Sequence, residues 1–593
     1  MCRIAGLVTN ALQGDEIKQT VNAMCTVLKH GGPDDEGVYC STDTRVVFGH
    51  RRLSIIDLST NGHQPMADAG QKARITFNGE IYNYTELKAE LQLLGAKFNT
   101  DTDTEVIIQA YLYWGTNSFS KLRGMFAFAL YDTITGAVYL VRDTIGVKPL
   151  YYYVNNGQLY FASEIKAFKA AAITTEEDTR WPVWLLAFGH IPEPYTTLKN
   201  VLSIPKGHFL CWDKSGTYTI TNYQKPSTVN YITDIETARL GLQTHLKTAI
   251  RRQLIADAPI GIFLSGGIDS SLLALLANEE IEQLKTISIF FNEQQYDERK
   301  YQHAVANKIA GQNFTHLVKQ QDFEEAFPQI LTAMDMPTTD GINSWFISKY
   351  AHQDGLKTVL SGIGADELFG GYPSFNRMKP LRHLKMLPST LFTLIKPFSR
   401  NRYKKLAYLE NNNTIADYLF LRGLYVAADI AKLTGMDEDE VKGILFDNID
   451  IPKIDAYNKL QAAWMETNLY MQNQLLRDTD MMSMSHSLEV RVPYLDEDFQ
   501  AYAAQIHPDI RFNDHQPKKI LIDSFKDVLP EAVWNRPKMG FTFPLQQWMK
   551  DNREISDANN YHGKTAKKLI NNFNNGRIHW SRAFALYQVQ GHV

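Results

Sequence analysis

Gly261-Ile262-Phe263-Leu264-Ser265-Gly266-Gly267-Ile268-Asp269-Ser270-Ser271 runs from an apolar strand through two glycines into a helix. Such a turn directs several backbone N–H groups and the positive end of the helix dipole toward one point, which suits an anion. The hydroxyls of Ser265, Ser270 and Ser271 add hydrogen-bond donors. The lysine of a Walker loop is missing. The stretch therefore predicts an anion-binding loop that differs from the phosphoryl-transfer P-loop.

Helices alternate with apolar strands on both sides of this loop. We expect helices at 234–254, 271–278 and 299–310, and strands at 260–264, 286–291 and 358–360. This alternation is typical of a parallel sheet covered by helices. A second loop, residues 360–372, also follows an apolar strand, and ligands collect at the carboxyl ends of parallel strands. Both loops are therefore predicted to border one site, with Asp366 and Glu367 placed to bind Mg²⁺.

The first 190 residues have a different pattern. Short segments rich in β-branched and aromatic residues, such as 46–56, 73–77, 125–131 and 137–141, predict antiparallel strands, with helices at 85–94 and 104–113. Asn155-Asn156-Gly157 predicts a hairpin turn. A stretch rich in proline, glycine and tyrosine follows, and we interpret residues 191–233 as the connection between two domains. From residue 456 onward the chain is expected to be mostly helical.

Composition excludes several classes of protein. The 593 residues carry a formal net charge of −4, which gives no general attraction to nucleic acid. Four scattered cysteines form neither a disulfide framework nor a CxxC metal pair, so we expect a reducing cytoplasm. The amino terminus does not resemble a signal peptide, and no apolar run is long enough to span a bilayer. We therefore expect neither a nucleic acid nor a membrane as partner.

Cys2 becomes the terminal residue if Met1 is removed. An α-amine has a pKa of about 7.7 to 8 and a thiol of about 8.5, so a fraction of each is in the reactive form at neutral pH. The amine can take the thiol proton, directly or through a water, while the sulfur attacks an amide carbon. Cys2 is therefore a candidate nucleophile that carries its own base.

The string SGGIDSS resembles the PP-loop of ATP pyrophosphatases, which cut ATP between its α and β phosphates. Together with Cys2 and GADELFGGY, it makes the whole chain resemble the glutamine-dependent asparagine synthetase family. The resemblance implies an α+β N-terminal-nucleophile (Ntn) hydrolase sandwich at 1–190, a class II glutamine amidotransferase domain. It further implies an α/β parallel-sheet PP-loop domain with a helical carboxyl-terminal region at 234–593.

In that family, glutamine is hydrolysed in the first domain and ammonia passes through an internal tunnel to the second. ATP there activates a carboxylate as an acyl-adenylate, which ammonia attacks. The resemblance thus implies glutamine, aspartate and Mg²⁺-ATP as ligands, and it is compatible with a homodimer.

Glutamine-site residues are carried over from three motifs. GHRRLSIID at 49–57 resembles the family's arginine segment, and FNGEIYN at 77–83 resembles its NGEIYN loop. By this resemblance Arg52 would pair with the glutamine α-carboxylate, as a planar guanidinium suits. Asn78 and the N–H of Gly79 would form the oxyanion hole. Asp103 would hold the substrate α-amine, and Glu80 belongs to the same glutamine-binding set.

ATP-site residues are carried over in the same way. Asp269 and Asp366 are implied to help hold Mg²⁺, and Lys518 is implied to approach pyrophosphate and the adenylate. SLEVRVPYLD at 487–496 resembles the family's LExRxPFLD segment. The implied nucleotide-binding set comprises Leu264, Ser265, Gly266, Gly267, Asp269, Ser270, Ser271, Ser361, Gly362 and Lys518.

Three departures from the family pattern stand out. Arg3 occupies a position that is usually glycine, and we give it no role. Ile363 replaces a residue that is commonly a glutamate proposed to act in proton transfer, and residues 334–344 differ from the usual EPxxDPS-like string.

These departures leave the acceptor open. Aspartate is the default, and the alternative is another carboxylate such as a uronic acid sugar or a specialised metabolite. An intramolecular cyclase of the β-lactam synthetase type is disfavoured by Cys2, Arg52, Asn78 and Asp103. A glutamine-binding regulatory protein is disfavoured because it requires the loss of a catalytic centre, and only Ile363 indicates such a loss.

Overall fold

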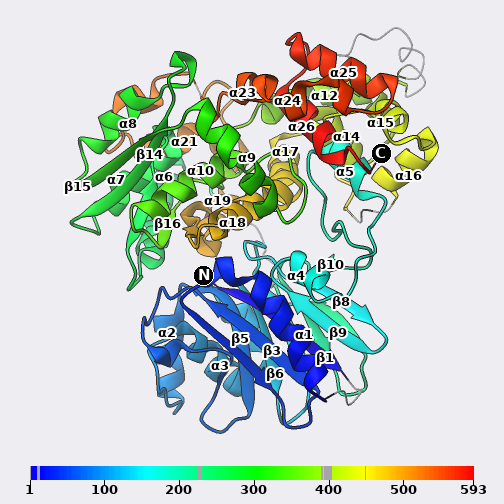
Figure 1. Ribbon diagram of the computed structural model, residues 1–593. Helices are drawn as coiled ribbons and strands as arrows, with labels where there is room; N and C mark the ends of the chain where they lie inside the picture. Colours follow the sequence, from blue (N-terminus) through cyan, green and yellow to red (C-terminus); the bar gives the residue numbers. More distant parts are fainter. Residues whose placement is uncertain are drawn as a thin grey trace.

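The computed structural model describes residues 2–9, 14–224, 230–388, 392, 404–447, 449, 451–537 and 539–592. A β-sandwich and a parallel-sheet domain meet near the amino terminus, and a mostly helical region packs beside the parallel sheet (Figure 1). Met1 and residues 225–229 of the expected connection lie outside the described part of the chain. No helix within that part is both long and apolar enough to cross a membrane.

The sandwich consists of two antiparallel sheets with apolar residues packed between them. The first sheet has the order β10 (Leu202–Ser203), β8 (Tyr151–Asn155), β9 (Gln158–Ala162), β1 (Arg3–Thr9), β3 (Val46–Arg52) and β2 (Asp35–Cys40). The second has the order β12 (Tyr218–Asn222), β11 (His208–Trp212), β7 (Val138–Arg142), β6 (Gly124–Asp132), β5 (Ala73–Ile81) and β4 (Met66–Ala67). Side chains of β1, β3, β6 and β7 share the core between the sheets.

Helices cover both outer faces of this sandwich. One face packs against α1 (Gly14–Val27) and α4 (Lys166–Ala170), and the other against α2 (Tyr84–Leu93) and α3 (Asp103–Trp114). These four layers form the Ntn hydrolase sandwich, and the hairpin turn closes β8 onto β9 with Asn155 opposite Gln158. The antiparallel class and helices at 85–94 and 104–113 are confirmed to within a residue or two.

The structure differs from sequence analysis in the segment interpreted as a connection. Residues 202–222 form β10, β11 and β12. β10 pairs with β8, β11 pairs with β7 and β12 pairs with β11, so both sheets of the sandwich are extended. These strands are short, and the β8 and β7 partners of β10 and β11 lie about 50 to 70 residues earlier, so local composition conceals them.

A second difference concerns α5 (Trp181–Phe188), which sequence analysis places in the first domain. Every residue of this helix is buried, and it packs against α14 (Thr414–Arg422), α15 (Ala427–Thr434), α16 (Glu438–Phe446) and α26 (Trp580–Val589). Figure 1 shows it among these helices, away from the sandwich. The chain therefore enters the helical region and returns to form β10.

The parallel sheet has the order β15 (Gly311–Leu317), β14 (Leu284–Phe290), β13 (Ile260–Phe263), β16 (Thr358–Leu360) and β17 (Glu489–Arg491). Its face with Ile262 and Leu360 packs against α6 (Ile235–Gln253), α7 (Ile268–Ala277), α8 (Arg299–Ala306), α19 (Glu497–Gln505) and α21 (Lys519–Ser524). The face with Ile287 and Val359 packs against α9 (Gln320–Ala333), α10 (Ile342–Gln353) and α18 (Arg477–Met484). The predicted PP-loop architecture is confirmed.

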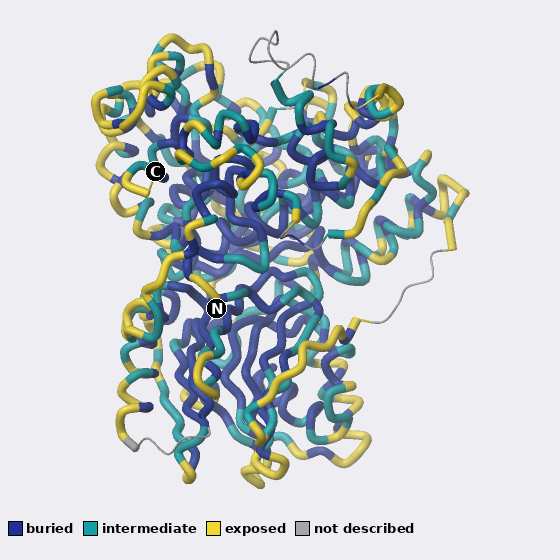
Figure 2. Tube along the Cα trace, turned by 90° about the vertical axis from the view of Figure 1, so that its right-hand side faces the viewer, coloured by how far each residue is buried: buried dark blue, intermediate teal, exposed yellow. Residues whose placement is uncertain are grey.

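Further helices form the helical region, of which the part from residue 456 onward was predicted. They include α12 (Pro373–Lys385), α17 (Lys459–Met465), α23 (Leu545–Asp551), α24 (Arg553–Ser556) and α25 (Lys564–Asn574). A π-helical segment, Glu466–Leu476, joins α17 to α18 without a break. This continuous helix brings α18 to the junction between the domains, where Asp480 contacts Arg3 of β1. Much of the tube above and below the marked amino terminus is buried (Figure 2).

Candidate active sites

Cys2 immediately precedes β1 and is only 8% exposed. Its backbone nitrogen donates to Asn78 Oδ1 at 3.1 Å, and Sγ lies 4.0 Å from the carbonyl oxygen of Leu53. Burial raises the pKa of the Cys2 thiol to about 11, against the opposing effect of the amino-terminal charge and Arg52. The thiol is therefore protonated at neutral pH and needs a base as it attacks. The α-amine that removal of Met1 would free is the candidate base.

The two candidate oxyanion donors lie side by side on β5. The Oδ1 of Asn78 faces Cys2, while its buried Nδ2 has no hydrogen-bond partner within the described part of the chain. Gly79 has φ of +154°, and a Cβ there would lie 2.2 Å from the carbonyl oxygen of Met125 on β6. Asn78 thus holds an unused donor beside the thiol, and the close approach of β6 requires glycine next to it.

We predict that Asn78→Ala lowers the glutaminase kcat about a hundredfold, because one oxyanion donor contributes roughly that much. The KM for glutamine should change little, since this donor acts on charge that develops during attack. Steady-state glutamate release measures both constants. Asn117→Ala, an exposed position of the same domain, is the control. Equal kcat in wild type and Asn78→Ala would contradict the oxyanion assignment.

Arg52 and Asp103 present opposite charges to one small pocket. The Arg52 guanidinium donates to the carbonyl oxygens of Ser59 at 2.7 Å, Ile56 at 3.5 Å and Asp57, which leaves its charge uncompensated by these partners. Asp103 Oδ2 accepts from Ile81 N at 3.0 Å. The pocket is lined by Cys2, Arg52, Leu53, Ile55, Ile56, Gly62, Gln64, Phe77, Gly79, Glu80, Thr102, Asp103 and Thr104. This pair of charges complements the carboxylate and ammonium of an α-amino acid.

Glu80 lines the same pocket but also contacts the second domain. Its Oε1 lies 3.5 Å from the guanidinium of Arg491 on β17. Burial and Glu489 raise the pKa of Glu80, and Arg491 opposes them. The backbone oxygen of Arg491 in turn accepts from Ser361 N at 2.8 Å. Glu80 is therefore both a pocket residue and an inter-domain contact, which the motif alone does not indicate.

The predicted phosphate loop opens into a large cavity of about 710 Å³ in the second domain. Eight of the ten predicted nucleotide-site residues line it, namely Leu264, Ser265, Gly267, Asp269, Ser270, Ser361, Gly362 and Lys518. Gly266 and Ser271 do not. The Ser271 side chain is completely buried, and Gly266 has φ of +79° with its ideal Cβ 3.1 Å from Tyr301 Cβ. These two residues therefore support the conformation of the loop from outside the cavity.

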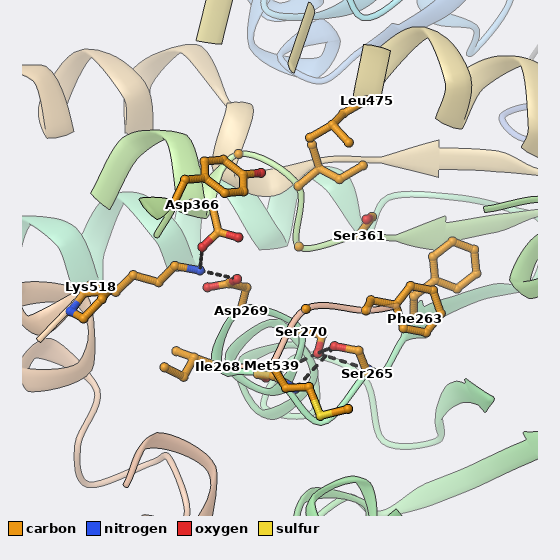
Figure 3. A pocket seen from close by; sticks show the side chains of 18 of the residues that line it. Phe263, Ser265, Ile268, Asp269, Ser270, Ser361, Asp366, Leu475, Lys518 and Met539 are labelled. Atoms are coloured by element: carbon orange, nitrogen blue, oxygen red, sulfur yellow. Dashed lines mark hydrogen bonds and ion pairs between the residues drawn. The ribbon is translucent and has the colours of Figure 1, made fainter. Parts of the chain in front are cut away.

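Hydrogen bonds between serines fix the first loop, and a glycine brings the second against it. Ser265 Oγ lies 2.9 Å from Ser270 Oγ, which also accepts from Ser265 N at 3.1 Å. A Cβ on Gly362 would lie 2.9 Å from Asp269 Cβ, so the loops approach each other closely. Both serines and Ser361 are seen around one opening in Figure 3.

Lys518 joins the two loops electrostatically. Its ammonium contacts Asp269 Oδ2 at 2.5 Å and also Asp366 Oδ1, as the dashed lines in Figure 3 show. Burial opposes its charge, but the two carboxylates hold the pKa of Lys518 above its usual range. Mg²⁺ in phosphate sites is typically held by one or two carboxylates together with substrate phosphates. Asp269 and Asp366 already direct two carboxylate oxygens at one cation, the Lys518 ammonium, so their arrangement fits Mg²⁺.

A further part of this cavity's lining was not predicted from the sequence. Asp340, Asn343, Ser344, Asp478 and Thr479 line it, as does Arg536, which donates to Glu298 at 2.7 Å. Asp340, Asn343 and Ser344 fall in the departing segment 334–344, whereas Asp478 and Thr479 lie inside a long helix with no turn or glycine to mark them. The only local signal of a site there is that two carboxylates, Asp478 and Asp480, lie within one helical turn of Arg477.

Ile363 belongs to an apolar cluster between the two sites. It packs with Leu475 against the buried residues Tyr82, Met125, Val147, Met471, Leu476, Met484, Val492 and Leu495. Ile363 and Leu475 also line the large cavity, while Tyr82 follows Glu80 by two residues. Side chains from both domains therefore fill the space between the cysteine pocket and the nucleotide cavity.

These two sites define a class: a ligase with an amidotransferase domain fused to an ATP pyrophosphatase domain. The asparagine synthase family matches residues 241–569, and the glutamine amidotransferase domain family matches residues 1–224. The chain belongs to the asparagine synthase family and is a glutamine-dependent ligase, and family membership implies the use of ATP.

Curated relatives cover nearly the whole chain. Asparagine synthetase [glutamine-hydrolyzing] 1 of Bacillus subtilis is 31% identical over 93% of this chain and 88% of its own length. A putative asparagine synthetase [glutamine-hydrolyzing] of Mycobacterium bovis is 31% identical over 91% of this chain and 86% of its own length. Amidase chry2 of Gibberella zeae is 28% identical over 92% and 90% of the two chains.

Proposed function

We propose that the protein makes asparagine from aspartate, glutamine and ATP, and releases glutamate, AMP and pyrophosphate. The observation that carries this proposal is the arrangement of two polar sites on either side of one buried apolar cluster. One site has the charges for an amino acid and a thiol beside an unused amide donor. The other has the loops and cations for a nucleotide.

In the first half-reaction the Cys2 sulfur attacks the amide carbon of glutamine. Arg52 binds the α-carboxylate and Asp103 the α-ammonium, which orients the amide toward the thiol. Asn78 Nδ2 and Gly79 N stabilise the negative oxygen, and the α-amine of Cys2 takes the thiol proton and returns it to the leaving nitrogen. Water then releases glutamate from the thioester.

The ammonia crosses the junction through the apolar cluster that contains Ile363. An apolar interior disfavours a charged ammonium and tolerates a small neutral molecule, so this lining keeps the nitrogen nucleophilic. The cluster joins Tyr82 and Met125 of the sandwich to Val492 and Leu495 of the parallel-sheet domain.

In the second half-reaction the carboxylate attacks the α-phosphorus of ATP, and pyrophosphate leaves. The loop donors at 265–270 and Lys518 bind the phosphates and offset charge on the leaving group. Mg²⁺, held by Asp269 and Asp366 when bound, would neutralise phosphate charge. Ammonia then attacks the acyl-adenylate and displaces AMP.

A second candidate acceptor, another carboxylate, is favoured by the part of the cavity lining that contains Asp340 and Asp478. Ile363 cannot exchange a proton, and Asp340 and Asp478 place two carboxyl groups in the cavity. Burial raises the pKa of Asp478 to about 7 and raises that of Asp340. Such a wall suits an acceptor rich in hydroxyl or amino donors.

A carboxylate screen decides between these acceptors. With glutamine and Mg²⁺-ATP present, we predict that aspartate stimulates pyrophosphate release at least tenfold over the rate without acceptor. Product analysis should find asparagine and AMP in equal amounts. Glutaminase activity without aspartate-dependent pyrophosphate, together with stimulation by a uronic acid, would replace aspartate by the second candidate.

We also propose the cytoplasm as the compartment. All four cysteines, Cys2, Cys25, Cys40 and Cys211, are free thiols in the structure, as a reducing environment favours.

A further inference from the structure

Arg3 is a completely buried charge that directly follows the nucleophile on β1. Its Nε donates to Glu164 Oε1 at 2.5 Å, and its NH1 donates to Asp480 Oδ2 at 2.8 Å. Glu164 belongs to the sandwich, whereas Asp480 belongs to α18 of the second domain. The residue next to the thiol is therefore tied to both domains at once.

Further buried charges reinforce this link. Glu164 also contacts His30 at 2.9 Å and Lys166 at 2.7 Å, and Asp480 also contacts Lys148 at 2.8 Å. Burial by itself would raise the pKa of Asp480, but Arg3 and Lys148 hold it below its usual range. The same balance, with Arg3, His30 and Lys166, holds the pKa of Glu164 well down. Both carboxylates are thus ionised and bonded from two or more directions.

Helix α18 has the nucleotide cavity on one side and Arg3 on the other. Asp478 and Thr479 line the cavity, and Asp478 accepts from the Thr338 hydroxyl at 2.6 Å. Residues two apart on an α-helix point about 200° away from each other. Asp480 therefore leaves the opposite side of the helix from Asp478, which is where Arg3 lies.

We propose that Arg3 is a positioning residue through which α18 couples nucleotide occupancy of the cavity to the nucleophile Cys2. This inference rests on the proposed function, because it assigns nucleotide to that cavity. Nucleotide bound in the cavity that Asp478 and Thr479 line biases the position of α18, and Asp480 carries the displacement to Arg3. A close-packed interior transmits such a shift because no void absorbs it.

The coupling acts on geometry at the thiol. Cys2 is one residue from Arg3, and its nitrogen and sulfur each face a fixed oxygen, on Asn78 and Leu53. A misplacement of about 1 Å at a reacting group can cost roughly a hundredfold in rate. Coupled sites typically change each other's affinity about fivefold or more, and a fraction of that displacement is sufficient for a rate effect of this size.

Glutaminase kinetics with and without Mg²⁺ and α,β-methylene-ATP test the proposal in the full-length enzyme. This analogue can occupy the nucleotide cavity but cannot be cleaved between the α and β phosphates. The assay therefore measures glutamine hydrolysis alone and contains no acceptor. We expect the analogue to change kcat/KM for glutamine about fivefold or more in wild type. In Asp480→Asn and Arg3→Lys the ratio of kcat/KM with the analogue to kcat/KM without it should fall to within about twofold of one. Lysine has a single ammonium in place of the two separate nitrogens, Nε and NH1, that Arg3 directs to Glu164 and Asp480.

Asp439→Asn, an exposed carboxylate on α16, should keep the wild-type ratio. An unresponsive wild-type glutaminase, or variants that keep the wild-type ratio, would overturn the inference. If Asp480→Asn does not fold, Arg3→Lys decides alone. A wild type without any glutaminase activity would instead overturn the proposed function.

Discussion

Replacement of Cys2 by alanine should abolish glutamine-dependent product formation and leave ammonia-dependent formation intact. Removal of the nucleophile of a hydrolase costs about 10⁶ in kcat, so no glutamate release above background is expected. Added ammonia bypasses the first site and reaches the acyl-adenylate from solution. Paired assays with glutamine or an ammonium salt as nitrogen donor measure the two routes separately.

The control for this variant is Cys211→Ala. Cys211 is a half-buried thiol on β11 and lies outside the lining of the glutamine pocket. The Cys211→Ala variant should keep both the glutamine-dependent and the ammonia-dependent activity. Glutamine-dependent turnover in Cys2→Ala at the wild-type rate would refute the nucleophile assignment. Loss of the ammonia-dependent rate as well would point to damage at the junction, where Cys2 precedes the buried Arg3.

The proposed base gives the glutaminase a definite pH dependence. Because burial holds the Cys2 thiol protonated at neutral pH, the rate follows deprotonation of the α-amine. Its ordinary pKa of about 7.7 to 8 places the rise of the rate in that range. Intact mass should show that the active form lacks Met1.

Local patterns were sufficient to predict the elements that carry the phosphate loop. The strand expected at 358–360 is β16 with the same bounds, and the strand expected at 260–264 is β13 less one residue. The glycine loop between β13 and α7 leaves few backbone alternatives, since Gly266 needs positive φ and Gly362 must approach Asp269. Because these constraints require particular residue types, they can be recognised in the sequence.

Contacts between domains could not be predicted in the same way. Arg3 departs from the family pattern, and nothing near it in the sequence reveals Asp480, 477 residues later. Glu80 belongs to a recognisable loop, yet its approach to Arg491 depends on how β17 enters the parallel sheet. Helix α5 looks apolar on all sides, which predicts burial without saying in which domain. These features depend on tertiary packing alone.

Replacement of Lys518 by methionine should remove adenylation while glutamine hydrolysis continues. Lys518 is 3% exposed, and its ammonium separates the carboxylates of Asp269 and Asp366. Without it, two like charges face each other and the phosphates lose a cation. Loss of one such group at developing charge costs about a hundredfold or more. We therefore expect pyrophosphate release with ammonia as nitrogen donor to fall by at least that factor.

Lys518→Arg should fail almost as completely, because a planar guanidinium does not match the compact ammonium in a slot bounded by two loops. Lys519→Met is the matched control, since Lys519 is the next residue and pairs instead with Asp523 on its own helix at 2.5 Å. It should keep wild-type pyrophosphate release. Persistent glutaminase activity in Lys518→Met shows that the chain is folded. Wild-type pyrophosphate release by that folded variant would exclude Lys518 from the nucleotide site and leave its two carboxylates as the groups to explain.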